Sequence, residues 1–535
     1  MTKLLSRILI IIICVSLLLV GCSGTSKTEK EDEVQPVGGN GEKEEEVEET
    51  GETQYVIEWC LKRTDALVDD PEIVKMIEEK HNVKINAWNL EPNQQYELLG
   101  IKIAAGEIPD VFTVNGYNNY RKYVDEGVLI ELDEDIVKEY APNVYAIYME
   151  ENPDALKYYK INGKLYGLPV YRDHYIYNRT PVVWRGDWLK NVGIEKTPET
   201  VEEFEEALYK FTNDDPDMNG EKDTYGMSTT GIDLFWGAFG IPKGIWDEKD
   251  GRLVYGSVQP ELKQALEYLA KWYKDGVIDP EFVTGENEGG YWAITHAFIN
   301  GKIGLTGHGA YYHWVTPMKE GQVGRHNYLE LEKVNPEAAK QLVIGMPPKG
   351  PDGKMGVTQE QIIEGGGNGT VFTINLKDDP GKLKKILQIF DWVHENEENY
   401  LSARWGIKEV HWEPDEDNGV KYIDENFKAA AHGGNTFFIL VEPVKFMKAA
   451  QGAQLVEFAE HYNFKTGGVQ NKLLTSLPSQ PQYEAELQKL ESEAFNDIIT
   501  GVKPVDYFDE FIEQWYKLGG QVLEEEANEW YSSFK

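Results

Sequence analysis

A short acidic loop, residues 215–223, has the residue types and the spacing of a calcium-binding loop. Counted from its first residue, oxygen-bearing side chains stand at positions 1, 3, 5 and 9, and Gly220 stands at position 6. Position 7 of such a loop supplies its backbone carbonyl, and the glycine permits the sharp turn. We therefore expect a structural Ca²⁺ ion bound by Asp215, Asp217, Asn219, Glu221 and Asp223.

The loop is nevertheless not a complete EF-hand. Position 12 is Gly226, where an EF-hand has a bidentate glutamate, and no helical pattern follows at once. A calcium-sensor role is therefore not expected. The alternative is a polar turn rich in Asp and Asn that binds no metal.

A cleavable export signal with a lipidation site opens the chain. Lys3 and Arg7 precede an apolar run over residues 8–20, which is too short for a helix that needs roughly 20 residues to cross a bilayer. The run ends in Leu-Val-Gly-Cys at residues 19–22, a bacterial lipoprotein signature. Cys22 is then expected to carry acyl chains such as palmitate and to begin the mature protein. The alternative is an ordinary signal peptide or signal anchor that contains a cysteine.

Length and charge restrict the possible folds and ligands of this chain, in which the signal peptide takes residues 1–21. The 535 residues are too many for one hydrophobic core, so two lobes are expected. Residues 22–53 are mostly Lys, Glu, Gly, Ser and Thr, which predicts an acidic disordered tether. The net charge of −39 repels polyphosphate and argues against nucleic-acid binding. Apart from Cys22, the mature chain has only Cys60, so no intramolecular disulfide is expected.

The folded part begins with alternating strand and helix patterns. Strands are predicted at residues 55–59, 83–85 and 109–114. Helices are predicted between them, the first after Asp70-Pro71 and the second ending at Gly106. This order implies a parallel sheet covered by helices, which is an α/β fold.

Three later stretches also predict helices. Thr200 and Glu203 form a capping box ahead of an apolar stripe. Asp379-Pro380 precedes apolar residues at helical spacing, and the last fifty residues carry two more apolar stripes.

Six short stretches follow one another along the folded part of the chain, at residues 104–112, 162–169, 188–204, 273–280, 298–304 and 405–412. Their order, which extends over nearly all of residues 54–535, resembles the family 1 extracellular solute-binding proteins of ABC importers, in particular the large lipoprotein branch that takes up oligosaccharides. Glu409 stands where the family usually has glycine.

The resemblance implies a two-lobed periplasmic-binding-protein-like fold of type II. Each lobe has a central sheet flanked by helices, and the ligand cleft lies between the lobes, which close by a hinge motion. By this likeness the N-terminal lobe takes residues 54–172 and 308–400, and the C-terminal lobe takes residues 173–307 and 401–535. In the resembling proteins an acidic loop holds a structural calcium, with an acid at position 10, where this chain has Thr224.

The same resemblance implies a function and its partners. We expect a monomer, lipid-anchored at the extracellular face of the cell membrane, that captures an oligosaccharide and delivers it to the ABC permease subunits. Saccharide sites combine aromatic rings, which stack on sugar C–H faces, with planar polar groups that bond hydroxyls. Ligands also sit at the carboxyl ends of parallel strands.

These rules and the resemblance together select twelve candidate binding residues. For any single aromatic among them core packing is an equal alternative, and the arginines can instead form surface ion pairs. If both arginines face the cleft, an acidic sugar such as a uronate is favoured. The candidates are Trp59, Arg63, Asn115, Tyr117, Tyr171, Arg172, Trp236, Trp292, His308, Tyr311, Trp314 and Trp412.

Catalytic motifs are missing from the sequence. It contains no His-Glu-x-x-His, Gly-x-Ser-x-Gly, Walker loop or Cys-x-x-Cys, and its ten histidines are scattered. We therefore expect a binding protein and no catalytic residue. A glycosidase needs only two carboxylates, so a cell-surface polysaccharide-processing enzyme stays open as the alternative, as does a non-transport carbohydrate adhesin.

Overall fold

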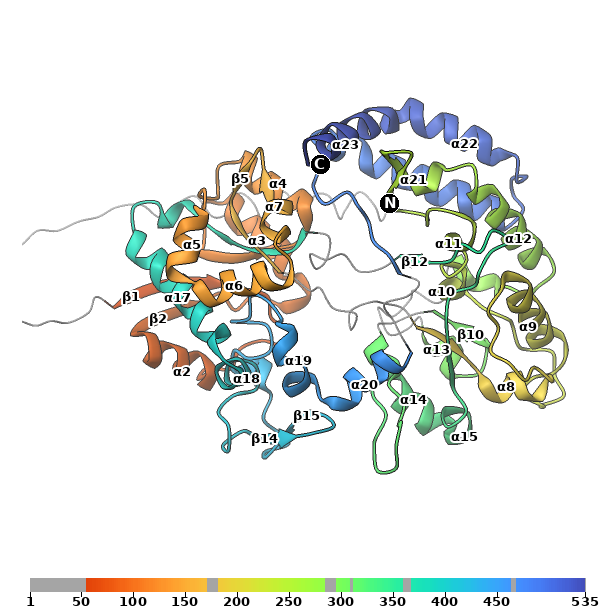
Figure 1. The fold of residues 1–535 in the computed structure, drawn as a ribbon, viewed down its shortest axis with the longest axis horizontal. Helices are drawn as coiled ribbons and strands as arrows, with labels where there is room; N and C mark the ends of the chain where they lie inside the picture. Colours follow the sequence, from red (N-terminus) through yellow and green to blue (C-terminus); the bar gives the residue numbers. More distant parts are fainter. Residues whose placement is uncertain are drawn as a thin grey trace, which may run out of the picture. The chain divides into compact units, whose positions relative to one another are not determined.

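The computed structural model describes residues 54–170, 181–283, 295–307, 311–358, 367–462 and 468–534. These residues form a mixed α/β structure with two principal sheets and many helices (Figure 1). Tyr171, Arg172, Trp292, His308 and Cys22, for which the sequence predicts roles, lie outside the described residues.

The first sheet has five strands in the order β2-β1-β3-β13-β6. β1 pairs in parallel with both β2 and β3, as the strand and helix alternation predicts. β13 is antiparallel to β3 and to β6, so this strand from the later chain joins the two. The strands are β1 (Tyr55–Cys60), β2 (Val83–Ala87), β3 (Val111–Val114), β6 (Gly167–Pro169) and β13 (Gly369–Phe372).

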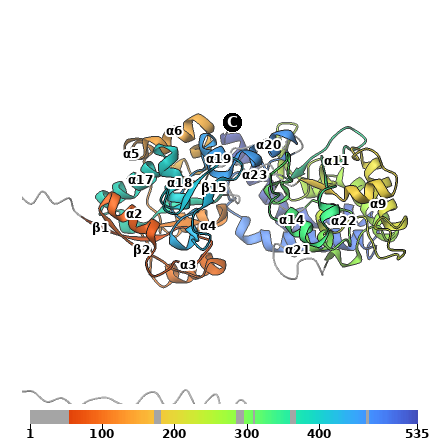
Figure 2. The same cartoon turned by 90° about the horizontal axis from the view of Figure 1, so that it is seen from below.

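Helices from two parts of the sequence pack with this sheet into one hydrophobic cluster. The longest, α17 (Pro380–Glu395), begins where predicted, because Asp379 accepts a hydrogen bond from the Lys382 backbone N–H as its N-cap. α17 lies against α6, α5 and α18 (Figures 1 and 2). The other helices are α2 (Glu72–His81), α3 (Gln95–Ala104), α4 (Gly116–Asp125), α5 (Glu134–Tyr140), α6 (Pro142–Glu151), α7 (Ala155–Tyr158), α18 (Glu397–Trp405) and α19 (Val444–Gln451).

A second hydrophobic cluster is mainly helical. Its helix α9 (Val201–Asn213) has the predicted capping box, with both hydrogen bonds between Thr200 and Glu203 formed. Near the end of the chain, α21 contacts both α12 and α22. The further helices are α8 (Gly186–Asn191), α10 (Thr229–Ile232), α11 (Trp236–Phe239), α12 (Leu262–Lys274), α21 (Gln480–Ile499), α22 (Tyr507–Trp515) and α23 (Gln521–Phe534).

The second sheet is antiparallel and has the order β10-β7-β11. It lies between the second cluster and a third, smaller one, since Val182 and Trp184 pack into one and Val183 into the other. The elements are β7 (Val182–Trp184), β10 (Leu305–Thr306), β11 (Val343–Gly345), α13 (His296–Ile299), α14 (Asn327–Val334), α15 (Pro336–Ala339) and α20 (Ala453–His461).

Four two-stranded pairings complete the strand content of the described chain. The β8–β9 pair extends from the second cluster, and the β14–β15 pair extends from the first. The pairs are β8 (Trp246–Lys249) with β9 (Arg252–Tyr255), β14 (Trp412–Asp415) with β15 (Gly419–Tyr422), β4 (Lys160–Ile161) with β5 (Lys164–Leu165), and β12 (Val357–Thr358) with β16 (Gly468–Val469).

The residue ranges that contribute to each hydrophobic cluster differ from the residue ranges predicted for the two lobes. Trp412, Phe437 and Val441 belong to the first cluster, and Trp314 and Leu331 belong to the third. The division of the chain into lobes by residue range therefore stays a prediction. Within the described residues, no helix is long and apolar enough to span a bilayer.

Candidate functional site

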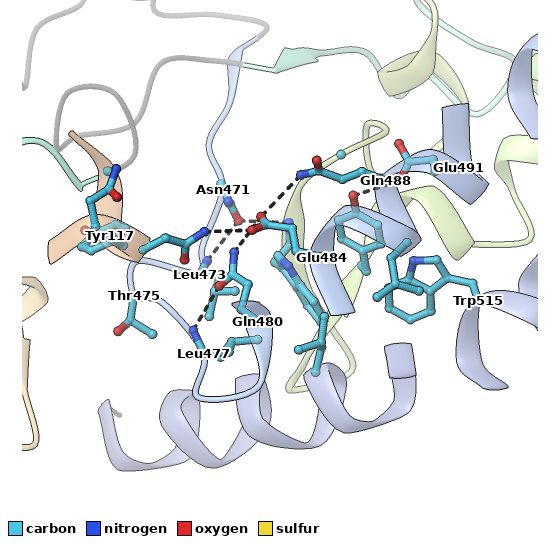
Figure 3. A pocket seen from close by; sticks show the side chains of 18 of the residues that line it. Tyr117, Asn471, Leu473, Thr475, Leu477, Gln480, Glu484, Gln488, Glu491 and Trp515 are labelled. Atoms are coloured by element: carbon cyan, nitrogen blue, oxygen red, sulfur yellow. Dashed lines mark hydrogen bonds between the residues drawn. The ribbon is translucent and has the colours of Figure 1, made fainter. Parts of the chain in front are cut away.

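A pocket of about 420 Å³ lies where the first sheet's β3 meets elements of the second cluster. Asn115 and the first turn of α4, which directly follow β3, form one side. The other sides are lined by Gly244 and residues of the β8–β9 pair, by residues 471–477, and by helices α21, α22 and α23. Figure 3 shows the residues of α21 with Trp515 and residues 471–477 around the pocket. The volume falls in the range of small-molecule sites, roughly 300–1,000 Å³.

Glu484 in α21 is the centre of a polar network in this pocket (Figure 3). One carboxylate oxygen accepts a hydrogen bond from Asn118 Nδ2 at 2.8 Å. The other accepts from Gln480 Nε2 at 2.9 Å and from Gln488 Nε2 at 3.4 Å. Carboxylates and primary amides are groups that can bond the vicinal hydroxyls of a sugar.

Aromatic rings line the pocket beside this network. The ring of Tyr255 stacks on that of Trp515 at 5.3 Å and 13°, and it lies 5.2 Å from that of Trp246. The Tyr255 hydroxyl donates to Glu491 Oε2 at 2.9 Å. Burial and the nearby charge of Glu491 raise the pKa of Tyr255, so its hydroxyl stays protonated at neutral pH. Trp246 and Trp515 are buried, at 7 % and 2 % exposure, and Tyr255 is half-buried, so the rings form an apolar wall packed behind the polar groups.

Residues beside β13, the strand next to β3 in the sheet, hold the first turn of α4 in place. Asn368, next to β13, accepts a hydrogen bond from the Gly116 N–H at 2.9 Å. Gly367 has φ of +113°, and a Cβ there would lie 2.5 Å from the ring of Tyr117, so only glycine fits this contact. Tyr117 is buried, and its hydroxyl has no hydrogen-bond partner in the described structure. Burial raises its pKa well above the usual range.

The acidic loop brings two of its predicted ligands, Asp217 and Asp223, to the side-chain amide of a third, Asn219. Asn219 Nδ2 donates to Asp217 Oδ2 at 3.0 Å and to both oxygens of Asp223 at 3.3 and 3.2 Å. Asp215 accepts from the backbone N–H groups of Asn219 and Gly220. The pKa of Asp217 is raised by burial and by the charges of Asp223 and Asp215. Glu221 is exposed. Within the described residues, no group of three His, Cys, Asp or Glu side chains is arranged to hold a metal ion.

Two of the predicted binding residues, Trp59 in the first cluster and the buried Arg63, line none of the described pockets. Trp59 is fully buried in β1, and its indole N–H donates to the Phe437 carbonyl at 3.3 Å. Arg63 is 4 % exposed, and its Nη1 donates to Asp65 O and to Asn89 Oδ1. Among the described groups, its Nε and Nη2 have no hydrogen-bond partner.

Three further tryptophans from the prediction also pack in hydrophobic clusters. Trp236 contacts Phe495 and donates to Asp233 Oδ1 at 3.0 Å. Trp314 is fully buried, and Trp412 donates to the Gly406 carbonyl at 2.6 Å and borders a second pocket.

The backbone of Tyr311 begins a short 3₁₀ helix, Tyr311–Trp314. Among the predicted residues whose side chains are described, Asn115 and Tyr117 are the two that line the Glu484 pocket.

The side of the pocket formed by α21 was not predicted from the sequence. In that segment the prediction used only the apolar stripe that faces the core. The sequence signal for this side of the pocket is a second, polar stripe at helical spacing, formed by Gln480, Glu484, Gln488 and Glu491. Trp515 belongs to an apolar stripe that predicts core packing, and Trp246, Tyr255 and Asn471 carry no comparable pattern.

Comparisons with known proteins agree on one family. The family model described as bacterial extracellular solute-binding protein matches residues 72–373. The chain is 26 % identical, over 99 % of both chains, to the polygalacturonan/rhamnogalacturonan-binding protein YtcQ of Bacillus subtilis (strain 168). It is 25 % identical to lipoprotein LipO of the same organism, over 85 % of this chain and 88 % of LipO.

A solved structure supports the fold. It is the S. pneumoniae ABC-transporter substrate-binding protein FusA, as an EF-hand mutant in complex with fructo-nystose. The TM-score is 0.64 at 17 % identity, and the match covers 90 % of this chain and 99 % of that one. The predicted fold of two α/β lobes, typical of periplasmic solute-binding proteins, is thereby confirmed.

Proposed function

Because the chain belongs to the bacterial extracellular solute-binding proteins, we propose that it captures an oligosaccharide outside the cell and delivers it to the permease of an ABC importer. YtcQ and FusA are named for binding a polysaccharide or an oligosaccharide, and neither is named for a reaction. A binding protein that leaves its sugar intact is therefore favoured over a polysaccharide-processing enzyme.

The Glu484 pocket is the observation that carries the proposal. It joins a carboxylate and several amides to the rings of Trp246, Tyr255 and Trp515 at the carboxyl end of β3. Ligands of α/β proteins bind at this end of the strands. The arrangement matches a sugar, which offers hydroxyl edges and apolar faces.

A lipid anchor at Cys22 belongs to the same proposal. The similarity to lipoprotein LipO and the lipoprotein signature at residues 19–22 both support it. An anchored receptor stays near its permease, so that the effective concentration of loaded receptor at the permease is high.

A structural calcium in the 215–223 loop is proposed as well, since the donor chemistry there fits a hard cation. The carboxylates of Asp217 and Asp223 already meet at the Asn219 side chain, and a half-turn of its amide would present Oδ1 in place of Nδ2. Burial and the nearby charges of Asp223 and Asp215 raise the pKa of Asp217, and a bound cation would relieve the repulsion among these carboxylates. FusA, whose mutant is described as altered in an EF-hand, supports this interpretation.

Calorimetry with a panel of neutral and acidic oligosaccharides tests the proposed function. We expect saturable binding of at least one sugar and recovery of that sugar unchanged by mass spectrometry. Gln488→Ala, at the exposed rim of the pocket, should weaken binding about fivefold, because an amide hydrogen bond is worth about 1 kcal/mol. Gln482→Ala is the control, since Gln482 is exposed on the same helix and does not line the pocket. Turnover of the sugar, or no binding across the panel, would contradict the proposal.

A further inference from the structure

The carboxylate of Glu484 is held by uncharged donors. Its three side-chain partners are the amides of Asn118, Gln480 and Gln488. By contrast, Glu491 on the same helix lies 3.2 Å from Lys243 Nζ. No such ion pair of Glu484 occurs in the described part of the chain. Within the described chain, the charge of Glu484 is therefore stabilised by amide dipoles and is not paired with a cation.

Among the described residues, the cation that forms an ion pair with a lining residue of this pocket is Lys243, which pairs with Glu491 and not with Glu484. The described residues that line the pocket include no Lys, Arg or His. Arg63, the described arginine that the sequence suggests for an acidic ligand, does not line it. Figure 3 shows Glu484 between Tyr117 and the ring of Trp515. The hydroxyl of Tyr117, a lining residue that is 8 % exposed, has no partner among the described groups.

A carboxylate-bearing sugar and a neutral sugar meet this site differently. A sugar hydroxyl can donate to Glu484 in a charge-assisted hydrogen bond, replacing one of the amide donors. A uronate carboxylate offers no donor and repels Glu484 at close range, in a pocket with aromatic walls that lower the local dielectric constant. Each of these amides has a second N–H that could reach a ligand oxygen, so it is the charge of Glu484, and not a lack of donors, that disfavours a second carboxylate beside it.

We propose that Glu484 is a specificity-determining residue that requires the sugar unit seated in this pocket to be uncharged. The proposal rests on the proposed function, and it adds the charge of the ligand at this position. A polymer with alternating acidic and neutral units would place a neutral unit here.

Matched pairs of ligands that differ in charge provide the test. One pair is an oligogalacturonide and its carboxyl-reduced counterpart, and a second is a xylo-oligosaccharide with and without a glucuronate side group. The readout is the ratio of the two dissociation constants, acidic over neutral, measured by calorimetry. Glu484→Gln keeps the size of the side chain and should lower this ratio at least fivefold by tightening the acidic member. Gln488→Lys, on an exposed rim residue, should lower it in the same direction.

Glu486→Gln is the control, because Glu486 is exposed on the same helix and lies off the pocket, and the substitution removes the same charge. It should leave the ratio within twofold of the wild-type value. Thermal melts establish that each variant is folded. A ratio that stays within twofold in both Glu484→Gln and Gln488→Lys overturns the proposal while leaving the proposed function intact. Absence of any binding by the wild-type protein contradicts the proposed function and, with it, this inference.

Discussion

Asn118 in α4 donates its side-chain amide to Glu484 in α21 at 2.8 Å, across 366 residues of sequence. The same Asn118 accepts from the Ser476 hydroxyl at 2.6 Å. Ser476 belongs to the stretch in which Leu474 packs in the first cluster while Leu473 and Leu477 pack in the second. This hydrogen bond therefore joins two hydrophobic cores at the pocket.

We expect the Asn118–Glu484 pair to show an energetic coupling of about 1 kcal/mol, since one partner is charged and both are partly buried. A double-mutant cycle with Asn118→Ala, Glu484→Ala and the combined variant, followed by urea unfolding, measures it. Each single change should lower the free energy of unfolding, and the double variant should lose less than their sum. Additive losses, within about 0.5 kcal/mol, would show that the pair does not interact in solution.

Trp59 provides a second prediction, because its burial is complete. The ring packs at 5.4 Å from that of Phe390 and at 5.2 Å from that of Phe438. Trp59→Ala should cost about 3–5 kcal/mol of unfolding free energy by leaving a cavity. Trp59→Phe should cost less and should leave the sugar affinity of the folded protein unchanged. A tenfold weaker affinity in a Trp59→Phe variant that melts normally would instead support its predicted role in binding.

Local signals made much of the fold predictable from sequence. Thr200 caps its helix through Glu203, and Asp379 caps its helix through the Lys382 N–H. Both contacts join residues three positions apart, so a short stretch of sequence predicts them. The three parallel strands also follow from local alternation of strand and helix. The antiparallel entry of β13 into the first sheet did not, since its partner β3 lies far earlier in the chain, with Gly369 opposite Val114.

The site was harder to predict for two physical reasons. Tryptophan suits both a hydrophobic core and a sugar-stacking surface, and Trp59, Trp314 and Trp412 are nearly or fully buried. The polar network around Glu484 joins segments distant in sequence, so no short motif carries it. Asn115 and Tyr117 were found because the carboxyl end of a strand is a local feature.

Calcium should stabilise the folded protein through the 215–223 loop. At a free Ca²⁺ concentration of 100 times the dissociation constant, the linkage contributes about 2.7 kcal/mol. Chelator should therefore lower the melting temperature of the wild-type protein by several degrees. Asp223→Asn removes a carboxylate that faces Asn219 and should abolish most of this response. Glu206→Gln, in an exposed ion pair with Lys210, is the control that should keep it. Equal melting of the wild type in chelator and in millimolar Ca²⁺ would rule the site out.

The lowered pKa of His81 leads us to expect a loss of stability in mild acid. Burial, together with the charges of Lys385 and Lys80, lowers its pKa from 6.5 to about 4. Between these values the unfolded chain binds a proton that the folded chain does not, so the free energy of unfolding falls as the pH falls from 6.5 to 4. His81→Gln should flatten this part of the stability profile. His461→Gln replaces an exposed histidine and should not. Parallel profiles for the wild type and His81→Gln would contradict the assignment.

The predicted lipid anchor separates location from binding. Cys22→Ala removes the thiol that would be acylated, and the acyl chains are what hold the protein at the membrane, at about 0.8 kcal/mol per buried CH₂. We expect this variant in the culture medium rather than in the membrane fraction, with unchanged affinity for the sugar. Radiolabelled palmitate should enter the wild-type protein and not the variant. Uptake of the sugar by cells should fall, because the loaded receptor is diluted away from the permease. Retention of Cys22→Ala at the membrane would point to a signal anchor. Loss of sugar binding in the released protein would contradict the expectation that the lipid anchor affects only location and the folded part alone binds the sugar.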